Sequence, residues 1–141
     1  MYGETLCAET ERVAKGVVHA LYTVHSRMGA GLLESVYEAC VAYELRNAGF
    51  TVERQKPVPI IYDDVQLDEG FKLDLPVNGC VIVEIKAVEK IAPVHQAQVK
   101  TYLRLTDVEL GILANFNVPL IKDGLQRIIL TRQQRVASFT Q

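Results

Sequence analysis

Hydrophobic residues follow a helical period at the start of the chain. Between residues 5 and 25 they recur at steps of three and four, which places them on one face of a helix. They are Leu6, Thr10 (weakly apolar), Val13, Val17, Leu21 and Val24. The segment 26-SRMGAG-31 then interrupts the pattern with two glycines.

A second helix is predicted from about Leu32 to Ala48. Gly49 follows as the left-handed residue after its last turn, and Phe50 can fold back on that turn. The positions predicted to point inward are Leu33, Val36, Tyr37, Cys40, Val41 and Leu45.

Strand patterns begin after residue 50. Thr51–Lys56 lies next to prolines and suits an edge strand, which Val58–Tyr62 continues. The segment 63-DDVQLDEG-70 then predicts a turn. In Phe71–Val77 apolar and polar residues alternate, which predicts Phe71, Leu73, Leu75 and Val77 on one face and Lys72 and Asp74 on the other. Asn78-Gly79 predicts a turn, and Cys80–Lys86 the next strand.

The remaining elements complete an α/β pattern. Pro93 suits a first helical turn, so a helix is predicted from there to Leu105, with Val94, Ala97, Thr101 and Leu105 packing on a sheet. Leu110–Phe116 is a short apolar strand, and Asp123-Gly124 forms a turn into a strand over Leu125–Leu130. The order predicts a single α/β domain over residues 1–141, with a mixed sheet flanked by helices.

Composition is compatible with one globular domain. The chain has 141 residues, of which 49% are hydrophobic, and a formal net charge of -2. That charge gives no argument for a polyanionic partner, and a basic C-terminal part is weak support for nucleic acid: Lys122, Arg127, Arg132 and Arg135.

Cysteine spacing and hydropathy indicate a cytoplasmic protein that does not enter membranes. Cys7, Cys40 and Cys80 form no CxxC pair, so neither a zinc site nor a disulfide framework is predicted. Buried free thiols fit a reducing compartment. The sequence has no signal segment, and no apolar run approaches the roughly 18 residues of a spanning helix.

Two charged residues interrupt the apolar strand 81-VIVEIKAVEK-90. Glu84 and Lys86 are two residues apart, so they lie on the same face of a strand. Burying such groups is unfavourable unless they are paired or used in chemistry. The simplest interpretation is a surface ion pair on a half-exposed sheet.

The position of Asp74 relative to Glu84 depends on the hairpin register. A two-residue turn would place the two carboxylates on opposite faces. A three-residue loop with a left-handed glycine pairs Pro76 with Cys80 and brings even-numbered residues to one face. Only this register gives both strands a common apolar face, so we expect Asp74, Glu84 and Lys86 to lie together.

Two carboxylates and a lysine on one face have a chemical use. Carboxylate oxygens bind Mg²⁺, which polarises a phosphoryl oxygen and lowers the pKa of a bound water. A lysine can orient that water or neutralise charge that grows on the phosphate.

Two further groups are candidates for the same site. His95, Gln98 and Tyr102 recur at steps of three and four, hence along one face of the predicted helix, where a solvated surface is the simpler interpretation. Glu34 lies in the first turn of the second helix, where a carboxylate is ordinarily explained by the helix dipole.

Several motifs resemble those of the bacterial GxxExxY proteins, in the same order along most of the chain. The segment 31-GLLESVY-37 matches the signature that gives the family its name. The segments 84-EIKAV-88, 93-PVHQAQVKTYLRLT-106 and 111-GILANFNVPLIKDGLQRI-128 are also similar to that family.

The resemblance implies a PD-(D/E)XK nuclease-like, that is restriction-endonuclease-like, core and Mg²⁺-dependent cleavage of phosphodiesters. Asp74 corresponds to the motif's single Asp, although Leu73 replaces the proline before it, and Glu84 and Lys86 correspond to its (D/E)-x-K. Glu34 corresponds to the acidic residue of the preceding helix. Gln98 and Tyr102 resemble the Q-x-x-x-Y pair that lies near the bound strand in RecB-type nucleases.

The sequence therefore favours a small nuclease that uses Mg²⁺ or Mn²⁺ and acts on DNA. Asp74 and Glu84 are the expected metal ligands, with the Ile85 carbonyl as a third and Glu34 binding directly or through water. Lys86 is the expected catalytic lysine, and the expected substrate-binding residues are Gln98, Tyr102 and His95.

Two other functions stay open. One is a non-catalytic interaction or nucleic-acid-binding module that keeps the fold, and a chain of this size often joins a larger complex or a homodimer. The other is hydrolysis of a small nucleotide. The residues do not distinguish DNA from RNA, or one metal ion from two.

Overall fold

The computed structural model describes residues 6–137. The helices are α1 (Ala8–Met28), α2 (Glu34–Asn47), α3 (Pro93–Thr106) and α4 (Arg132–Ala137). The strands are β1 (Lys56–Tyr62), β2 (Val65–Leu73), β3 (Leu75–Val77), β4 (Val81–Lys86), β5 (Leu110–Asn115) and β6 (Leu125–Ile129), and a 3-10 helix, η1, spans Ile121–Gly124.

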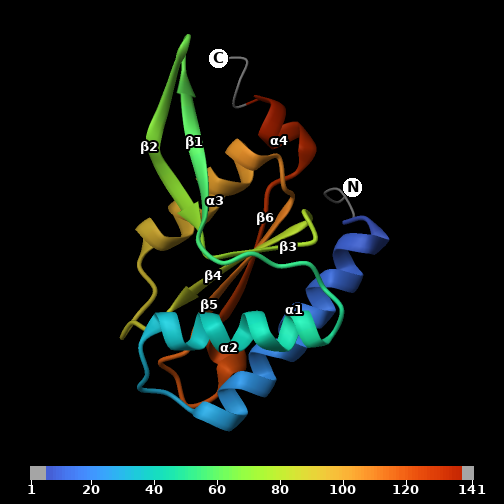
Figure 1. Ribbon diagram of the computed structural model, residues 1–141, viewed down its shortest axis with the longest axis vertical. Helices are drawn as coiled ribbons and strands as arrows, with labels where there is room; N and C mark the ends of the chain where they lie inside the picture. Colours follow the sequence, from blue (N-terminus) through green and yellow to red (C-terminus); the bar gives the residue numbers. More distant parts are fainter. Residues whose placement is uncertain (1–5, 138–141) are drawn as a thin grey trace.

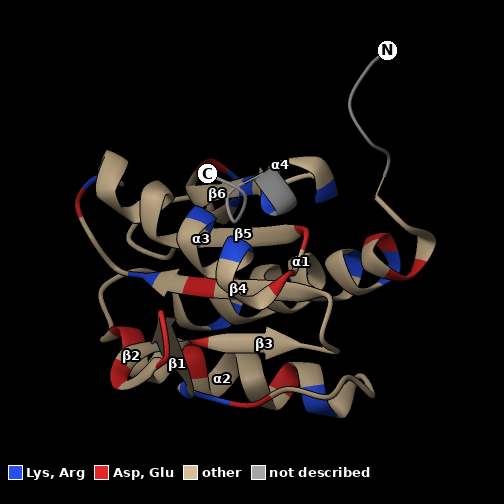
Figure 2. Ribbon diagram, turned by 90° about the horizontal axis from the view of Figure 1, so that it is seen from above, with Lys and Arg blue, Asp and Glu red and all other residues tan. Residues whose placement is uncertain are grey.

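Four of the strands form a central mixed sheet in the order β3-β4-β5-β6. The inner strands β4 and β5 are parallel and are connected through α3, whereas both outer pairs are antiparallel. The sheet lies between α2 and α3 (Figure 2). The predicted fold class is confirmed: a mixed α/β domain whose mixed sheet is flanked by helices.

Helix α1 confirms the predicted apolar stripe. All six residues of the stripe are buried, and they pack on one face of the sheet together with α2. The helix continues three residues beyond the predicted end, because its last turn closes at Gly29, whose φ of 68° ends the helical path. The predicted start at residue 5 lies outside the described residues. Within residues 6–137, no helix has the length and apolar character needed to cross a membrane.

Helix α2 ends as predicted but faces the core differently. Gly49 has a φ of 91°, and its N–H donates to the Arg46 carbonyl while Phe50 N–H donates to the Leu45 carbonyl, which is a Schellman motif. The inward prediction is wrong for Leu33 and Val36, which are 73% and 36% exposed. The helix begins only at Glu34, so Leu33 precedes it.

The segment before the central sheet forms a ribbon that the sequence did not predict. Residues 51–55 are not an edge strand and contribute one isolated bridge, between Val52 and Val77. Strand β1 begins at Lys56 and includes the predicted strand Val58–Tyr62. Most of the predicted turn over 63–70 is strand, because the chain reverses within Asp63-Asp64. The resulting pair β1–β2 is a separate two-stranded sheet that extends from the body of the molecule (Figure 1).

The chain bends at Asp74, where it passes from the ribbon into the central sheet. The bend corrects the predicted common face of Phe71, Leu73, Leu75 and Val77. The last two pack with α1 and α2, whereas Leu73 packs on the opposite face with Phe71 against it. The alternation in this stretch therefore belongs to two strands in different sheets.

Helix α3 covers the second face of the sheet with a different stripe from the predicted one. Its buried residues are Val99 and Leu103, whereas Val94 is 57% exposed. Gly111 on β5 makes the close approach feasible, because a Cβ at that position would lie 2.5 Å from Val99 Cγ1. Glu84 and Lys86 share this face of β4 with Ile82, because they lie two and four residues after it.

Candidate active site

The β3–β4 hairpin has the predicted parity. Val77 pairs with Val81 and Leu75 with Val83, so the next pair in this register consists of Asp74 and Glu84. The loop consists of residues 78–80, and the predicted pairing of Pro76 with Cys80 is wrong by two positions. A shift by two keeps even-numbered residues on one face, so Asp74 and Glu84 share a face.

Two hydrogen bonds hold the carboxylates of Asp74 and Glu84 in place where the strand pairing ends. The backbone N–H of Asp74 donates to Glu84 Oε1 at 3.2 Å. The backbone N–H of Ile85 donates to Asp74 Oδ2 at 2.9 Å. Each carboxylate therefore accepts a hydrogen bond from a backbone N–H across the hairpin. These bonds satisfy N–H groups at the bend, where the regular strand pairing stops.

The Glu84 carboxyl is strongly perturbed by this environment. It is 4% exposed, and burial, followed by the nearby Asp74 carboxylate, raises its pKa to about 8. The Lys86 ammonium lowers the pKa by a smaller amount. The site thus places a buried carboxyl group beside a partly exposed carboxylate, which is the environment expected of a group with a chemical role.

Lys86 lies at the end of β4 and is partly exposed. Among the ion pairs between residues 6 and 137, none joins Lys86 to a carboxylate within 4.0 Å. Glu84 and Lys86 are therefore not the surface ion pair of the simpler interpretation. Figure 2 shows the acidic and basic positions of β4 next to each other near its end.

The other two predicted metal ligands lie near the same strand end. Glu34 is the first residue of α2, and its Oε2 accepts the backbone N–H of Ala87 at 3.0 Å, one residue beyond Lys86. Ile85 is buried, and its amide is the one that binds Asp74. Within residues 6–137, however, no three His, Cys, Asp or Glu side chains are grouped closely enough to hold a metal ion.

The predicted substrate-binding residues on α3 differ in their surroundings. Tyr102 stacks on Phe71, with ring centroids 4.5 Å apart. Burial raises the pKa of Tyr102, as do the neighbouring charges of Glu84 and Asp74, so its phenol lies near both carboxylates. His95 accepts the Ala92 N–H at Nδ1, which leaves only Nε2 for a ligand, and Gln98 is exposed.

The sequence analysis missed two residues near Asp74: Gln55, which contacts Asp74 directly, and Glu38, which is linked to Asp74 through Gln55. Gln55 Nε2 donates to Asp74 Oδ1 at 2.9 Å and to Glu38 Oε2 at 2.7 Å. Glu38 is buried and lies one helical turn after Glu34, on the stripe of α2 that continues through Val41. A carboxylate on an otherwise apolar stripe was the available signal.

The donor set suits a hard divalent cation. Asp74 and Glu84 supply carboxylate oxygens side by side, and oxygen ligands are those that Mg²⁺ and Mn²⁺ prefer. A cation between them would offset the repulsion that raises the pKa of Glu84. The residues present therefore fit Mg²⁺, with two carboxylates rather than a closed cage of ligands.

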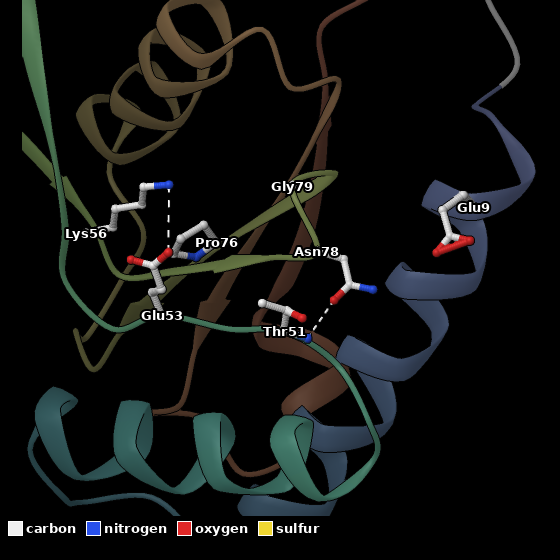
Figure 3. A pocket seen from close by; sticks show the side chains of 7 residues that line it. All are labelled: Glu9, Thr51, Glu53, Lys56, Pro76, Asn78 and Gly79. Carbon is white, nitrogen blue, oxygen red and sulfur yellow. Dashed lines mark hydrogen bonds and ion pairs between the residues drawn. The ribbon is translucent and has the colours of Figure 1, made fainter.

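A separate pocket of about 390 Å³ lies at the edge strand β3 and the loop after it. It contains none of the candidate site residues, and it includes the 3.9 Å ion pair of Glu53 and Lys56 (Figure 3). Its lining is Glu9, Thr51, Glu53, Lys56, Pro76, Asn78 and Gly79. This pocket is distinct from the carboxylate pair.

Comparison with known protein families identifies a superfamily. A family model described as "PD-(D/E)XK nuclease superfamily" matches residues 11–128, a range that contains every candidate site residue. No curated protein and no solved structure matches the chain.

Proposed function

The chain belongs to the PD-(D/E)XK nuclease superfamily, and from this premise we propose that it is a Mg²⁺-dependent nuclease that hydrolyses phosphodiester bonds of DNA. The observation that carries the proposal is the position of Asp74 beside Glu84, with Lys86 two residues after Glu84. The Asp74 N–H donates to Glu84 Oε1, and the Ile85 N–H donates to Asp74 Oδ2. The signature 31-GLLESVY-37 supports placing the chain among the GxxExxY proteins of this superfamily.

Asp74 and Glu84 would hold the cation, which can be Mg²⁺ or Mn²⁺. The Ile85 carbonyl would add a backbone oxygen, and Glu34 would bind directly or through a water from the start of α2. Each Asp74 oxygen already accepts one hydrogen bond and keeps a second lone pair for the metal. When bound, the cation supplies Lewis-acid activation of the phosphoryl group and of a water.

Lys86 supplies a positive charge that no ion pair of the described residues holds in place. It has a partly exposed ammonium beside the carboxylates, so it can orient the attacking water or stabilise charge on the phosphate in the transition state. A lysine already held in an ion pair would be less available for either role.

Three residues of α3 are the proposed contacts to the nucleic acid. Tyr102 presents its phenol near the carboxylates and is held by the stacked Phe71 ring. Gln98 lies one turn earlier and is exposed, so its amide can bind a phosphate or a base. His95 offers Nε2 because its Nδ1 is occupied by the backbone of the same helix.

A non-catalytic binding module is the second candidate, and the charge of the β1–β2 ribbon favours it. The ribbon and its turn expose four carboxylates against two lysines, which is unfavourable for a phosphate backbone. The acidic residues are Asp63, Asp64, Asp68 and Glu69, and the lysines are Lys56 and Lys72. Such a surface suits a protein partner, including a second copy of the chain.

The deciding experiment is cleavage of single-stranded, duplex and branched DNA, and of RNA, with Mg²⁺ or Mn²⁺. We expect the wild-type protein to cleave at least one of these and Lys86→Ala to lose about 100-fold or more of the rate. Lys15→Ala is the matched control, because Lys15 is an exposed lysine on α1. Equal absence of cleavage in the wild type and Lys86→Ala on every substrate would overturn the enzyme proposal and favour the binding module.

A further inference from the structure

The segment before the β1–β2 ribbon approaches Asp74 with both its backbone and a side chain. Gln55 N–H donates to the Asp74 carbonyl at 2.9 Å, and Gln55 Nε2 donates to Asp74 Oδ1 at 2.9 Å. Gln55 has a φ of 53°, in the left-handed region that few residues other than glycine adopt. The chain therefore takes an unfavourable backbone conformation at the residue that contacts Asp74 twice.

The same amide nitrogen also binds the buried carboxylate of α2. Gln55 Nε2 donates to Glu38 Oε2 at 2.7 Å, so its two hydrogens serve two different carboxylates. The other Glu38 oxygen accepts Arg54 Nε at 3.1 Å, which compensates the charge of a side chain that is 6% exposed. Glu38 is thus a fixed point against which Gln55 is held.

The contacts of Asp74 leave little freedom for its carboxylate. Oδ1 is held by Gln55 from the side of α2, and Oδ2 is held by the Ile85 amide from β4. A hydrogen bond from only one side would allow the carboxylate to rotate about its terminal torsion, which is soft. Two donors on opposite oxygens define its plane.

The network also ties Asp74 to the helix that carries Glu34. Arg54, besides its bond to Glu38, donates through Nη2 to the Ser35 carbonyl at 3.4 Å, in the first turn of α2. The chain of contacts from Ser35 to Asp74 therefore links two elements that the proposed metal site draws on. Outer hydrogen bonds of this kind orient metal ligands and tune their affinity.

We infer that Gln55 is a positioning residue that fixes the Asp74 carboxylate for metal binding, with Glu38 as its anchor. The inference rests on the proposed function, because it gives Asp74 the role of a metal ligand. It concerns residues that lie outside the D…(E)-x-K set and that act through Asp74.

Gln55→Met tests the inference, because methionine keeps the length of the side chain and removes both donors. The matched control is Gln66→Met, since Gln66 Nε2 also donates to an aspartate, Asp68, at 3.1 Å on the exposed ribbon. Mn²⁺ affinity is measured by titration calorimetry. We expect Gln55→Met to weaken Mn²⁺ binding about 10-fold and Gln66→Met to leave it unchanged. In cleavage assays the Mn²⁺ concentration for half-maximal rate should rise, with a rate at saturating Mn²⁺ near that of the wild type.

A measurement without metal separates this inference from the proposed function. The amide of Ile85 reports the position of Asp74 Oδ2, so NMR of the metal-free protein should show a shifted and faster-exchanging Ile85 amide in Gln55→Met but not in Gln66→Met. An unchanged Ile85 amide, or unchanged Mn²⁺ affinity in Gln55→Met, would overturn the inference. A changed amide in a protein whose wild type binds no Mn²⁺ would leave Gln55 as the residue that places Asp74 and reject the metal site.

Glu38→Gln provides the second variant if Gln55→Met does not fold. It keeps an oxygen that accepts from Gln55 and removes the charge that anchors it. As in Gln55→Met, we expect the Ile85 amide signal to shift and exchange faster. We also expect Mn²⁺ affinity to fall about threefold. Wild-type values for both would overturn the inference equally.

Discussion

The two sides of Asp74 show how one stretch of sequence divides into two environments. Leu75 and Val77 on β3 are fully buried, whereas Val65 and Leu67 on β2 are 54% and 39% exposed. Each strand contributes a leucine and a valine to this comparison, so residue type does not explain the difference. The difference arises because β3 joins a sheet covered by helices, while β2 pairs only with β1.

The comparison extends to the carboxylates of the two halves. Asp74 is held by two donors next to a buried glutamate, whereas Asp68 on the ribbon is exposed and accepts one bond from a glutamine two residues away. Only the first is placed where charge is costly and geometry is fixed. The body of the domain therefore carries the conditions for chemistry, which Asp68 on the ribbon lacks.

The largest expected contrast is between Asp74→Asn and Asp68→Asn. Both substitutions exchange one oxygen for an amide group and keep the shape of the side chain. We expect Asp74→Asn to abolish measurable Mn²⁺ binding and to lower the rate of phosphodiester cleavage by about 1000-fold, because a ligand and its charge are lost. Asp68→Asn should retain both, as measured by calorimetry and by cleavage kinetics. Equal effects of the two would remove the distinction between body and ribbon.

A second contrast concerns stability. Leu75→Ala should lower the free energy of unfolding by about 3 kcal/mol, because it opens a cavity at a residue with no exposed area. Leu67→Ala removes the same atoms from a side chain that is 39% exposed and should lower it by about 0.5 kcal/mol. Urea denaturation followed by circular dichroism measures both values. A loss at position 67 as large as that at position 75 would indicate that the ribbon's apolar face is covered by a partner copy in solution.

The sequence predicted the parts of this fold whose pattern is decided locally. The stripe of α1, the end of α2 at Gly49 and the apolar strand β5 follow from helical period, backbone conformation and burial on both faces. The face shared by Asp74 and Glu84 was also predicted, since parity survives a shift of the hairpin by two residues. These features depend on neighbours along the chain or on a single strand pair.

The sequence could not predict where a strand leaves one sheet for another. The alternation of apolar and polar residues continues through Leu73 and Leu75, because β2 and β3 each have a period of two. The bend between these strands is held by two hydrogen bonds of the Asp74 backbone: its carbonyl accepts from Gln55 N–H, and its N–H donates to Glu84. The role of Gln55 could not be predicted either, because its hydrogen-bond partners lie far from it in sequence, on α2 and at the bend. Contacts between elements that are distant in sequence leave no local period.

The pH dependence of stability sharpens the comparison further. Burial and Asp74 raise the pKa of Glu84 from its ordinary value of 4.5 to about 8, so the folded protein holds a proton there that the unfolded chain releases. Folding is then favoured most below pH 4.5, and this contribution is lost as the pH rises toward 8 and stays constant above it. Between pH 6 and pH 8 the metal-free protein should lose about 2 kcal/mol of stability from this group, since one pKa unit corresponds to about 1.4 kcal/mol.

Glu84→Gln and Glu69→Gln isolate that contribution, because Glu69 is an exposed carboxylate of β2. Glu84→Gln should flatten the dependence between pH 6 and pH 8 and be more stable than the wild type at pH 8, since no charge is then buried. Glu69→Gln should keep the wild-type slope. Urea unfolding at a series of pH values, with a chelator present, gives the three curves. A wild-type slope in Glu84→Gln would mean that the Glu84 carboxyl does not titrate between pH 6 and pH 8, and hence that its pKa is not raised in the folded protein.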